Sequence, residues 1–234
     1  MKTQEKTQPW IAVCTCALLT ACGGGSNSSS GPVTSTDTFQ LRTAYVSYLQ
    51  DTRSMPFTIT GTSSGNSVTG NGTTTQGSMS AATFEGQAAQ AKTTTVTGSF
   101  TLSGQSRTLA STTTAYVDSN YNPLGFNGSS YTVVTSSTPI PTTARVGDTG
   151  TWYSATRYSS SSKSTRSGTE IATYVLEPDT ASTALLKIIQ VQKDTNNSTT
   201  YTSTTTFRLT PSGALTRLTE TGESSTSSLT ATYN

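Results

Sequence analysis

Two serine patterns in this chain have the spacing of nucleophilic catalytic motifs. Residues 61–65, GTSSG, fit GxSxG, and residues 160–163, SSSK, fit SxxK. The first motif acts from a strained strand-to-helix turn with a histidine base, but the sequence contains no histidine. The second acts together with SDN and KTG motifs, which the sequence also lacks. We therefore interpret residues 160–163 as a hairpin tip, and predict that the protein is not an enzyme and has no catalytic residues.

Side-chain oxygens come close together in the sequence at two places. Glu177 and Asp179 flank a proline, and we expect a polar turn there, since a glycosidase needs two carboxyls that project into one cleft. Oxygen-bearing side chains alternate, as in a calcium-binding loop, at Asp118, Asn120 and Asn122. Proline stands where such a loop has glycine, and the twelfth position is not glutamate. We predict an Asx-type turn, with no metal and no cofactor.

The composition favours strands over both disorder and nucleic-acid binding. Hydrophobic residues make up 31% of the chain and charged residues 11%, while serine and threonine are unusually frequent. The formal net charge is only +2, and the scattered lysines and arginines form no basic run that could neutralise phosphates. Threonine, tyrosine and valine favour strands. We expect a β-rich domain that does not bind nucleic acid.

The first 22 residues have the organisation of a secretory targeting segment. Lys2 and Lys6 precede an uncharged, mostly apolar run over residues 10–21, which is too short to span a bilayer as a helix. The run ends in LTAC, residues 19–22, and a glycine- and serine-rich string follows. This tetrad resembles the lipobox of bacterial lipoproteins. The resemblance implies that Cys22 receives a diacylglyceryl group and becomes the N-terminus after cleavage.

The resemblance to lipoproteins also implies a domain organisation and a location. Residues 1–21 are the predicted signal peptide, residues 22–36 the lipidated cysteine and a flexible tether, and residues 37–234 the folded domain. Two or three acyl chains hold a protein durably on a membrane. Gly23 follows the cysteine, which in lipoproteins is compatible with export to the outer membrane. We expect the protein to be anchored in the outer membrane by its lipid, at the periplasmic face or the cell surface.

Periodicity predicts one helix followed by antiparallel strands. Apolar side chains recur at helical spacing over residues 37–51, on a face made by Leu41, Ala44, Tyr45, Tyr48 and Leu49. After residue 56 the period changes to two, and from about residue 147 turn signals separate the strands of a six-strand meander. We expect a mainly β fold. Its antiparallel meander sheet, open or shaped as a half-barrel or sandwich, carries one N-terminal amphipathic helix.

Two segments predict irregular structure. Residues 61–77 contain so many glycines that we expect a hairpin with loose ends instead of long, regular strands. Residues 118–131, dense in Asp, Asn, Pro and Gly, are the longest irregular connection that the sequence predicts. They mark a loose subdivision of the domain near residues 118–146.

The strand at residues 201–210 predicts which side of the sheet is buried. Phe207 and Leu209 share one face, and threonines dominate the other, which then faces solvent or a polar hollow. We expect Phe207 and Leu209 to pack against the helix face and against four residues of neighbouring strands. These four are Ile171, Val175, Ile189 and Val191.

Four further segments resemble hypothetical lipoproteins of Gram-negative bacteria that have no assigned activity. They are ATFEG at 82–86, NYNPLGF at 120–126, VGDTG at 146–150 and EPDTASTALLKI at 177–188. These are loop and turn residues, so the resemblance implies a shared fold and location and transfers no catalytic residue.

The sequence leaves two functions open, and the ligand-binding residues unknown. One function is a lipid-anchored, non-enzymatic domain that binds a protein, polysaccharide or lipid. The other is a structural or adhesive cell-surface protein without a ligand pocket. A concave apolar pocket favours the first function and a filled core favours the second.

Overall fold

The computed structural model describes residues 33–234, which form one helix and a single sheet of 13 strands. The predicted signal peptide, residues 1–21, and the predicted lipidation site Cys22 lie outside the described residues. In chain order the elements are α1 (Leu41–Gln50), β1 (Ser54–Ser63), β2 (Asn66–Gln76), β3 (Ser80–Phe84), β4 (Gln87–Leu102), β5 (Gln105–Val117), β6 (Pro123–Asn127), β7 (Tyr131–Ser137), β8 (Thr149–Tyr158), β9 (Arg166–Pro178), β10 (Ala184–Lys193), β11 (Thr199–Leu209), β12 (Leu215–Ser224) and β13 (Ser227–Tyr233).

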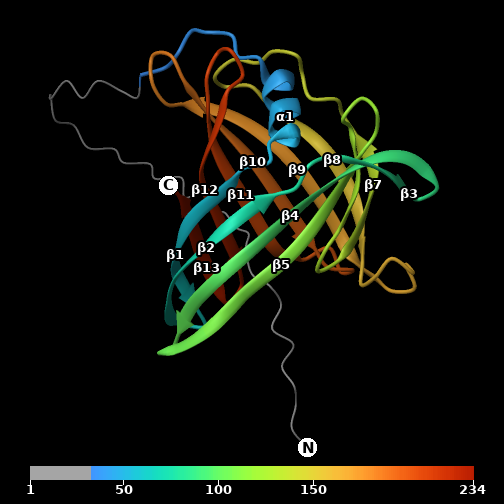
Figure 1. Cartoon of the computed structure of the whole chain (residues 1–234), viewed down its shortest axis with the longest axis vertical. Helices are drawn as coiled ribbons and strands as arrows, with labels where there is room; N and C mark the ends of the chain where they lie inside the picture. Colours follow the sequence, from blue (N-terminus) through green and yellow to red (C-terminus); the bar gives the residue numbers. More distant parts are fainter. Residues whose placement is uncertain (1–32) are drawn as a thin grey trace, which may run out of the picture.

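The sheet closes on itself as a 12-strand antiparallel barrel (Figure 1). From β4 to β13, strands that follow one another in the chain are neighbours; β13 then pairs with β1, β1 with β2, and β2 with β4. The predicted mainly β, antiparallel fold is confirmed, and the six-strand meander corresponds to β8–β13. The predicted half-barrel or sandwich is wrong, because pairing β2 with β4 joins the two ends of the sheet.

Strand β4 carries the closure because it has two partners along one edge. Its residues 87–91 pair with β3, and its residues 94–102 pair with β2. The opposite edge of β4 pairs with β5. Strand β3 therefore lies outside the ring of 12 strands. Its Phe84 packs on Tyr116 of β5 and Tyr131 of β7, with ring centroids 4.6 and 5.4 Å away.

Glycines allow close packing at the point of closure. The loose hairpin predicted over residues 61–77 is wrong, since β1 and β2 are regular strands there. A Cβ added at Gly72 would lie 2.6 Å from Cζ of Phe57, and one at Gly70 would lie 2.7 Å from Cβ of Phe100. The two aromatic side chains thus lie directly against glycine backbone. The glycines serve interior packing here and do not loosen the strands.

Alternation along the strands sets which side chains face the barrel interior. Phe207 is 5% exposed and inward-facing, as predicted. The register pairs Phe207 with Leu186 and Leu186 with Leu176, so even-numbered residues of β9 and β10 face inward. The predicted neighbours are therefore on the outer face: Ile171, Val175, Ile189 and Val191. That prediction was wrong because residues 184–191 are apolar on both faces, so the sequence does not show which of them face the interior.

The helix α1 lies in one mouth of the barrel (Figure 1). It is 10 residues long, shorter than the amphipathic helix predicted over residues 37–51. Tyr48 of α1 packs edge-on against Phe207 of β11, with ring centroids 5.4 Å apart. The predicted N-terminal amphipathic helix on a sheet is thus corrected to one short helix that packs on inward-facing residues of a barrel. Within residues 33–234, no helix has the length and apolar character needed to cross a membrane.

The segment just before α1 and the connection between β7 and β8 complete the cover over this mouth. Just before the helix, Phe39 forms a β-bridge with Ala144, and the backbone N–H of Gln40 donates to the carbonyl of Pro211. Phe39 and Ala144 are buried in the same core cluster as the first residues of α1. The cover therefore combines α1 with the connection between β7 and β8.

The irregular connection predicted over residues 118–131 is more ordered than expected. It contains the short strand β6, which pairs with β5 and with β7. The barrel wall therefore continues without interruption through this part of the chain.

Candidate functional site

A cavity of about 270 Å³ lies inside the barrel beneath α1. Its walls are predominantly apolar and aromatic: Tyr45 and Tyr48 project from α1, and Phe126, Trp152 and Ile188 come from β6, β8 and β10. Tyr45 packs edge-on against Trp152, with ring centroids 4.9 Å apart. We name this space the apolar chamber. Concave cavities with such a lining are typical of small-molecule sites, and the volume lies just below their usual lower limit of about 300 Å³.

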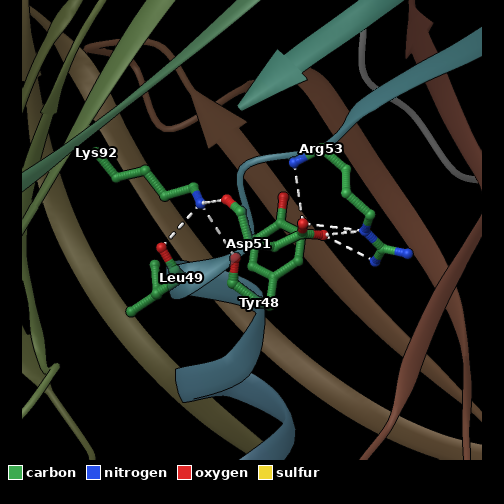
Figure 2. Close-up of polar contacts among 5 residues, drawn as sticks. All are labelled: Tyr48, Leu49, Asp51, Arg53 and Lys92. Atoms are coloured by element: carbon green, nitrogen blue, oxygen red, sulfur yellow. Dashed lines mark hydrogen bonds and ion pairs between the residues drawn. The ribbon is translucent and has the colours of Figure 1, made fainter. Parts of the chain in front are cut away.

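Lys92 lines the apolar chamber, and its ammonium group is bound to α1. It faces inward on β4, opposite Ala115 of β5, and is 3% exposed. Figure 2 shows its Nζ among three backbone carbonyls at the C-terminal end of α1. Nζ donates to the carbonyl oxygens of Tyr48 at 3.2 Å and Leu49 at 2.8 Å, and also to that of Asp51. Lys92 thereby connects the barrel wall to the helix.

The geometry around Lys92 selects its charged form. Carbonyl oxygens can only accept hydrogen bonds, so three of them match the three donors of an ammonium, whereas a neutral amine would direct its lone pair at one of them. The last carbonyls of a helix also carry the negative end of its dipole. Burial lowers the pKa of Lys92, and the negative charge of Asp51 opposes that shift. Lys92 thus acts as a cationic cap on α1.

A buried polar network lies on the barrel wall where the apolar chamber borders the rest of the interior. Glu170 of β9 accepts hydrogen bonds from the Tyr153 hydroxyl at 2.7 Å and from Gln192 Nε2 at 3.0 Å. Gln190 Nε2 donates to the Tyr153 hydroxyl at 2.8 Å, and the Ser203 hydroxyl donates to Gln190 Oε1 at 2.9 Å. Tyr153 and Gln190 line the apolar chamber, while Gln192 lines the space beyond it.

Burial sets the ionisation of this network. It raises the pKa of Glu170 above its ordinary value of 4.5, while the hydrogen bond from Tyr153 and the charge of Arg157 oppose the shift. Burial also raises the pKa of Tyr153, and the neighbouring Glu170 adds to that effect. Tyr153 is therefore a neutral donor, and Glu170 is shifted toward its neutral form.

A second cavity, of about 540 Å³, continues the interior away from α1. It shares Thr94 and Thr113 with the apolar chamber, so the two spaces adjoin. It extends to Ser129, in the turn between β6 and β7. We name it the polar chamber, because its walls include Arg157, Gln192, Tyr201, Arg217 and Glu220.

The two arginines of the polar chamber differ in their partners. Arg217 forms an ion pair with Glu220, and its guanidinium lies 4.4 Å from the ring centroid of Tyr233. Burial opposes the charge of Arg217, but Glu220 together with Tyr48 and Tyr233 outweighs it, and the pKa of Arg217 is raised. Arg157 has a buried Nε without a hydrogen-bond partner among the described residues. Burial lowers the pKa of Arg157, and the charge of Glu170 opposes that shift.

Two polar turns predicted from the sequence are confirmed. Asp118 Oδ1 accepts hydrogen bonds from the backbone N–H groups of Asn120 and Asn122, both at 2.8 Å, which defines an Asx-type turn. Residues 160–163 form the tip between β8 and β9, where Lys163 forms an ion pair with Glu85. In the described chain, residues 33–234, no three His, Cys, Asp or Glu side chains gather in a way that could hold a metal ion.

The remaining sequence candidates lie apart from one another. Glu177 pairs with Lys187 at 2.6 Å, and Asp179 pairs with Arg208 at 2.7 Å, so the two carboxyls have separate partners. The GTSSG pattern, residues 61–65, spans a hairpin between β1 and β2, which is not the strand-to-helix turn of a catalytic serine. The predicted lipidation site, Cys22, lies outside the described residues.

Sequence reasoning predicted apolar residues of the chamber such as Tyr45, Tyr48 and Phe207, but it missed the charged side chains that line the interior. Alternate residues of each strand face inward. Lys92 belongs to the inward-facing set of β4 with Val96 and Phe100, and Glu170 to that of β9 with Tyr174. The sequence signal for Lys92 and Glu170 was a charged residue at a position where the alternation of the strand predicts an inward-facing apolar residue. Arg157 carried a weaker signal, because a bulge at the end of β8 disturbs the alternation there.

Comparisons of this chain with models of protein families, with curated proteins and with solved structures gave no match. The geometry of the two chambers is therefore the basis for assigning a function.

Proposed function

We propose that the barrel is a non-enzymatic binding domain that holds a small, largely apolar molecule in the apolar chamber. The observation that carries this proposal is the concave, aromatic cavity of about 270 Å³ beneath α1. A structural or adhesive role needs only a filled interior. A cavity with apolar walls costs stability, because its lining side chains lose packing partners. A ligand that fills the chamber restores those contacts.

The chamber is built to hold a ligand in place. Tyr45 and Trp152 already contact each other edge-on across the boundary between helix and barrel, so their ring positions are fixed before binding. Tyr153 and Gln190 supply polar groups at the floor, where they are held by the network around Glu170. Few polar groups in an apolar site are what orients a small molecule.

Trp152 provides a direct test of this proposal. The chain has two tryptophans, Trp10 in the predicted signal peptide and Trp152, so in the Trp10→Phe variant the fluorescence reports only on the chamber, whether or not that peptide is removed. Titration with the neutral fluorophore N-phenyl-1-naphthylamine is expected to show saturable energy transfer from Trp152 with one site per chain. Transfer that stays linear with probe concentration would show that the interior does not bind apolar molecules.

We also propose that the domain is held at the outer membrane by lipid on Cys22. Support comes from the sequence: a charged start, an apolar run over residues 10–21, and the LTAC tetrad. A membrane anchor would place the barrel next to a source of apolar molecules, which suits the proposed ligand class. Palmitate labelling of the chain tests the anchor.

A further inference from the structure

The two chambers together form one interior with an apolar end and a polar end. They adjoin at Thr94 of β4 and Thr113 of β5, which line both. The register places these two threonines directly opposite each other. A molecule bound in the apolar chamber can therefore extend past them toward the polar chamber.

Three cationic side chains line these chambers within the described chain, and two of them are already neutralised or capped. Lys92 donates to the carbonyls at the end of α1, and Arg217 forms an ion pair with Glu220. Arg157 takes part in none of the ion pairs of residues 33–234. Its Nε is buried and has no hydrogen-bond partner there.

Glu170, whose charge acts on Arg157, does not supply the missing hydrogen-bond partner. Glu170 accepts hydrogen bonds from Tyr153 and Gln192, so both of its oxygens are engaged. Arg157 is partly buried and its Nε is fully buried, and a buried donor without a hydrogen-bond partner is unfavourable unless another group provides one. Two other groups of the polar chamber, Ser167 Oγ and Arg217 Nε, are also buried without hydrogen-bond partners among the described residues.

We propose that the ligand is an anionic amphiphile, whose carboxylate or phosphate head binds Arg157 in the polar chamber while its apolar part occupies the apolar chamber. This inference rests on the proposed function. The guanidinium of an arginine presents planar donors that match the oxygens of both anionic groups. The head thereby fills the vacant hydrogen-bonding position at Arg157 Nε.

Matched ligands of one chain length test the head group. Dodecanoate, dodecyl phosphate and 1-dodecanol are titrated below their aggregation concentrations into the full-length Trp10→Phe protein, with Trp152 fluorescence as the readout. One of the two anions, or both, should bind about tenfold or more tighter than 1-dodecanol, since a hydrogen bond to a charged group contributes about 1.5–3 kcal/mol. The preferred anion identifies a carboxylate or a phosphate source.

Variants of Arg157 decide whether this residue causes the preference. Arg157→Gln should reduce the affinity for the anion to that for 1-dodecanol and leave the affinity for 1-dodecanol unchanged. Arg157→Lys, which keeps the charge, should retain part of the preference. Arg208→Gln is the matched control, because Arg208 pairs with Asp179 on the outer face of β11; it should leave all affinities unchanged.

The outcomes separate this inference from the proposed function. Equal binding of all three molecules, or an anion preference that persists in Arg157→Gln, would overturn the head-group proposal and leave the apolar site standing. No binding of any of the three, together with no binding of the neutral fluorophore, would overturn both.

Discussion

The ammonium of Lys92 lies 2.8 Å from the carbonyl oxygen of Leu49, which ties the wall of the barrel to the last turn of α1. The contact is buried and joins residues 43 positions apart in the chain. It fixes a helix of 10 residues, too short to be stable in isolation, over the mouth of the apolar chamber.

Replacing Lys92 should therefore release the helix. Lys92→Met removes three donors and takes away the buried hydrogen bond to the Leu49 carbonyl, so we expect the free energy of unfolding to fall by about 1.5–3 kcal/mol in urea titrations. Amide hydrogen exchange in α1 should accelerate more than in β9. Lys187→Met is the control, since its ion pair with Glu177 is partly exposed and contributes less than about 1 kcal/mol. Equal losses in the two variants would refute the role of Lys92.

The pKa of Glu170 predicts how stability changes with pH. Because burial raises this pKa above 4.5 in the folded state, Glu170 keeps its proton to a higher pH in the folded protein than in the unfolded chain. The contribution of Glu170 to stability should therefore fall as pH rises from 4.5 through the folded-state pKa. Glu170→Gln removes this contribution, so the difference in denaturation midpoint between Glu170→Gln and the unchanged protein should vary with pH between 4.5 and 7.5. A difference that stays constant over this range would contradict the assignment.

The one-sided burial of β11 predicts unequal effects of two adjacent substitutions. Phe207 is 5% exposed and packs against Tyr48, whereas Thr206 belongs to the outer face. Phe207→Ala should lower the free energy of unfolding by about 3 kcal/mol, and Thr206→Ala by less than about 0.5 kcal/mol. Denaturant midpoints that shift equally in the two variants would show that the strand is not buried on one side.

The proposed lipid anchor predicts a simple labelling result. Cys22→Ser should abolish incorporation of radiolabelled palmitate and move the protein from the membrane fraction to the soluble fraction. Cys14→Ser lies within the predicted signal peptide and serves as the control, with labelling retained. Incorporation of palmitate into the Cys22→Ser protein would exclude Cys22 as the lipidation site.

The sequence predicts much of the wall of the barrel, because strands with one apolar face carry a clear period of two. Phe57 and Ile59 on β1, and Leu109 on β5, face inward as their alternation predicts. Turn residues between β8 and β13 also give the six-strand meander directly. Strand alternation and turn residues are local features of the sequence, so they can be recognised without knowledge of the closed fold.

Closure and the chambers could not be predicted, since they depend on contacts between distant residues. The pairing of β2 with β4 brings Gly70 opposite Phe100, and only then is it clear that this glycine makes room for the phenylalanine side chain. Likewise, Lys92 has no local signal for its partner, because Leu49 reaches it only once α1 enters the barrel mouth. Strand β10 is apolar on both faces, so its sequence alone does not show which residues face inward.

The central claim is that the apolar chamber is a binding site, and filling it with a side chain tests this most directly. Ala115 lines the chamber, while Ala110 lies on the outer face of the same strand β5 and is exposed. We expect Ala115→Phe to weaken binding of N-phenyl-1-naphthylamine at least about tenfold, because the ring occupies the space of the ligand. Ala110→Phe should leave the affinity unchanged, and circular dichroism should show both variants folded. Unchanged affinity in a folded Ala115→Phe protein would contradict the account.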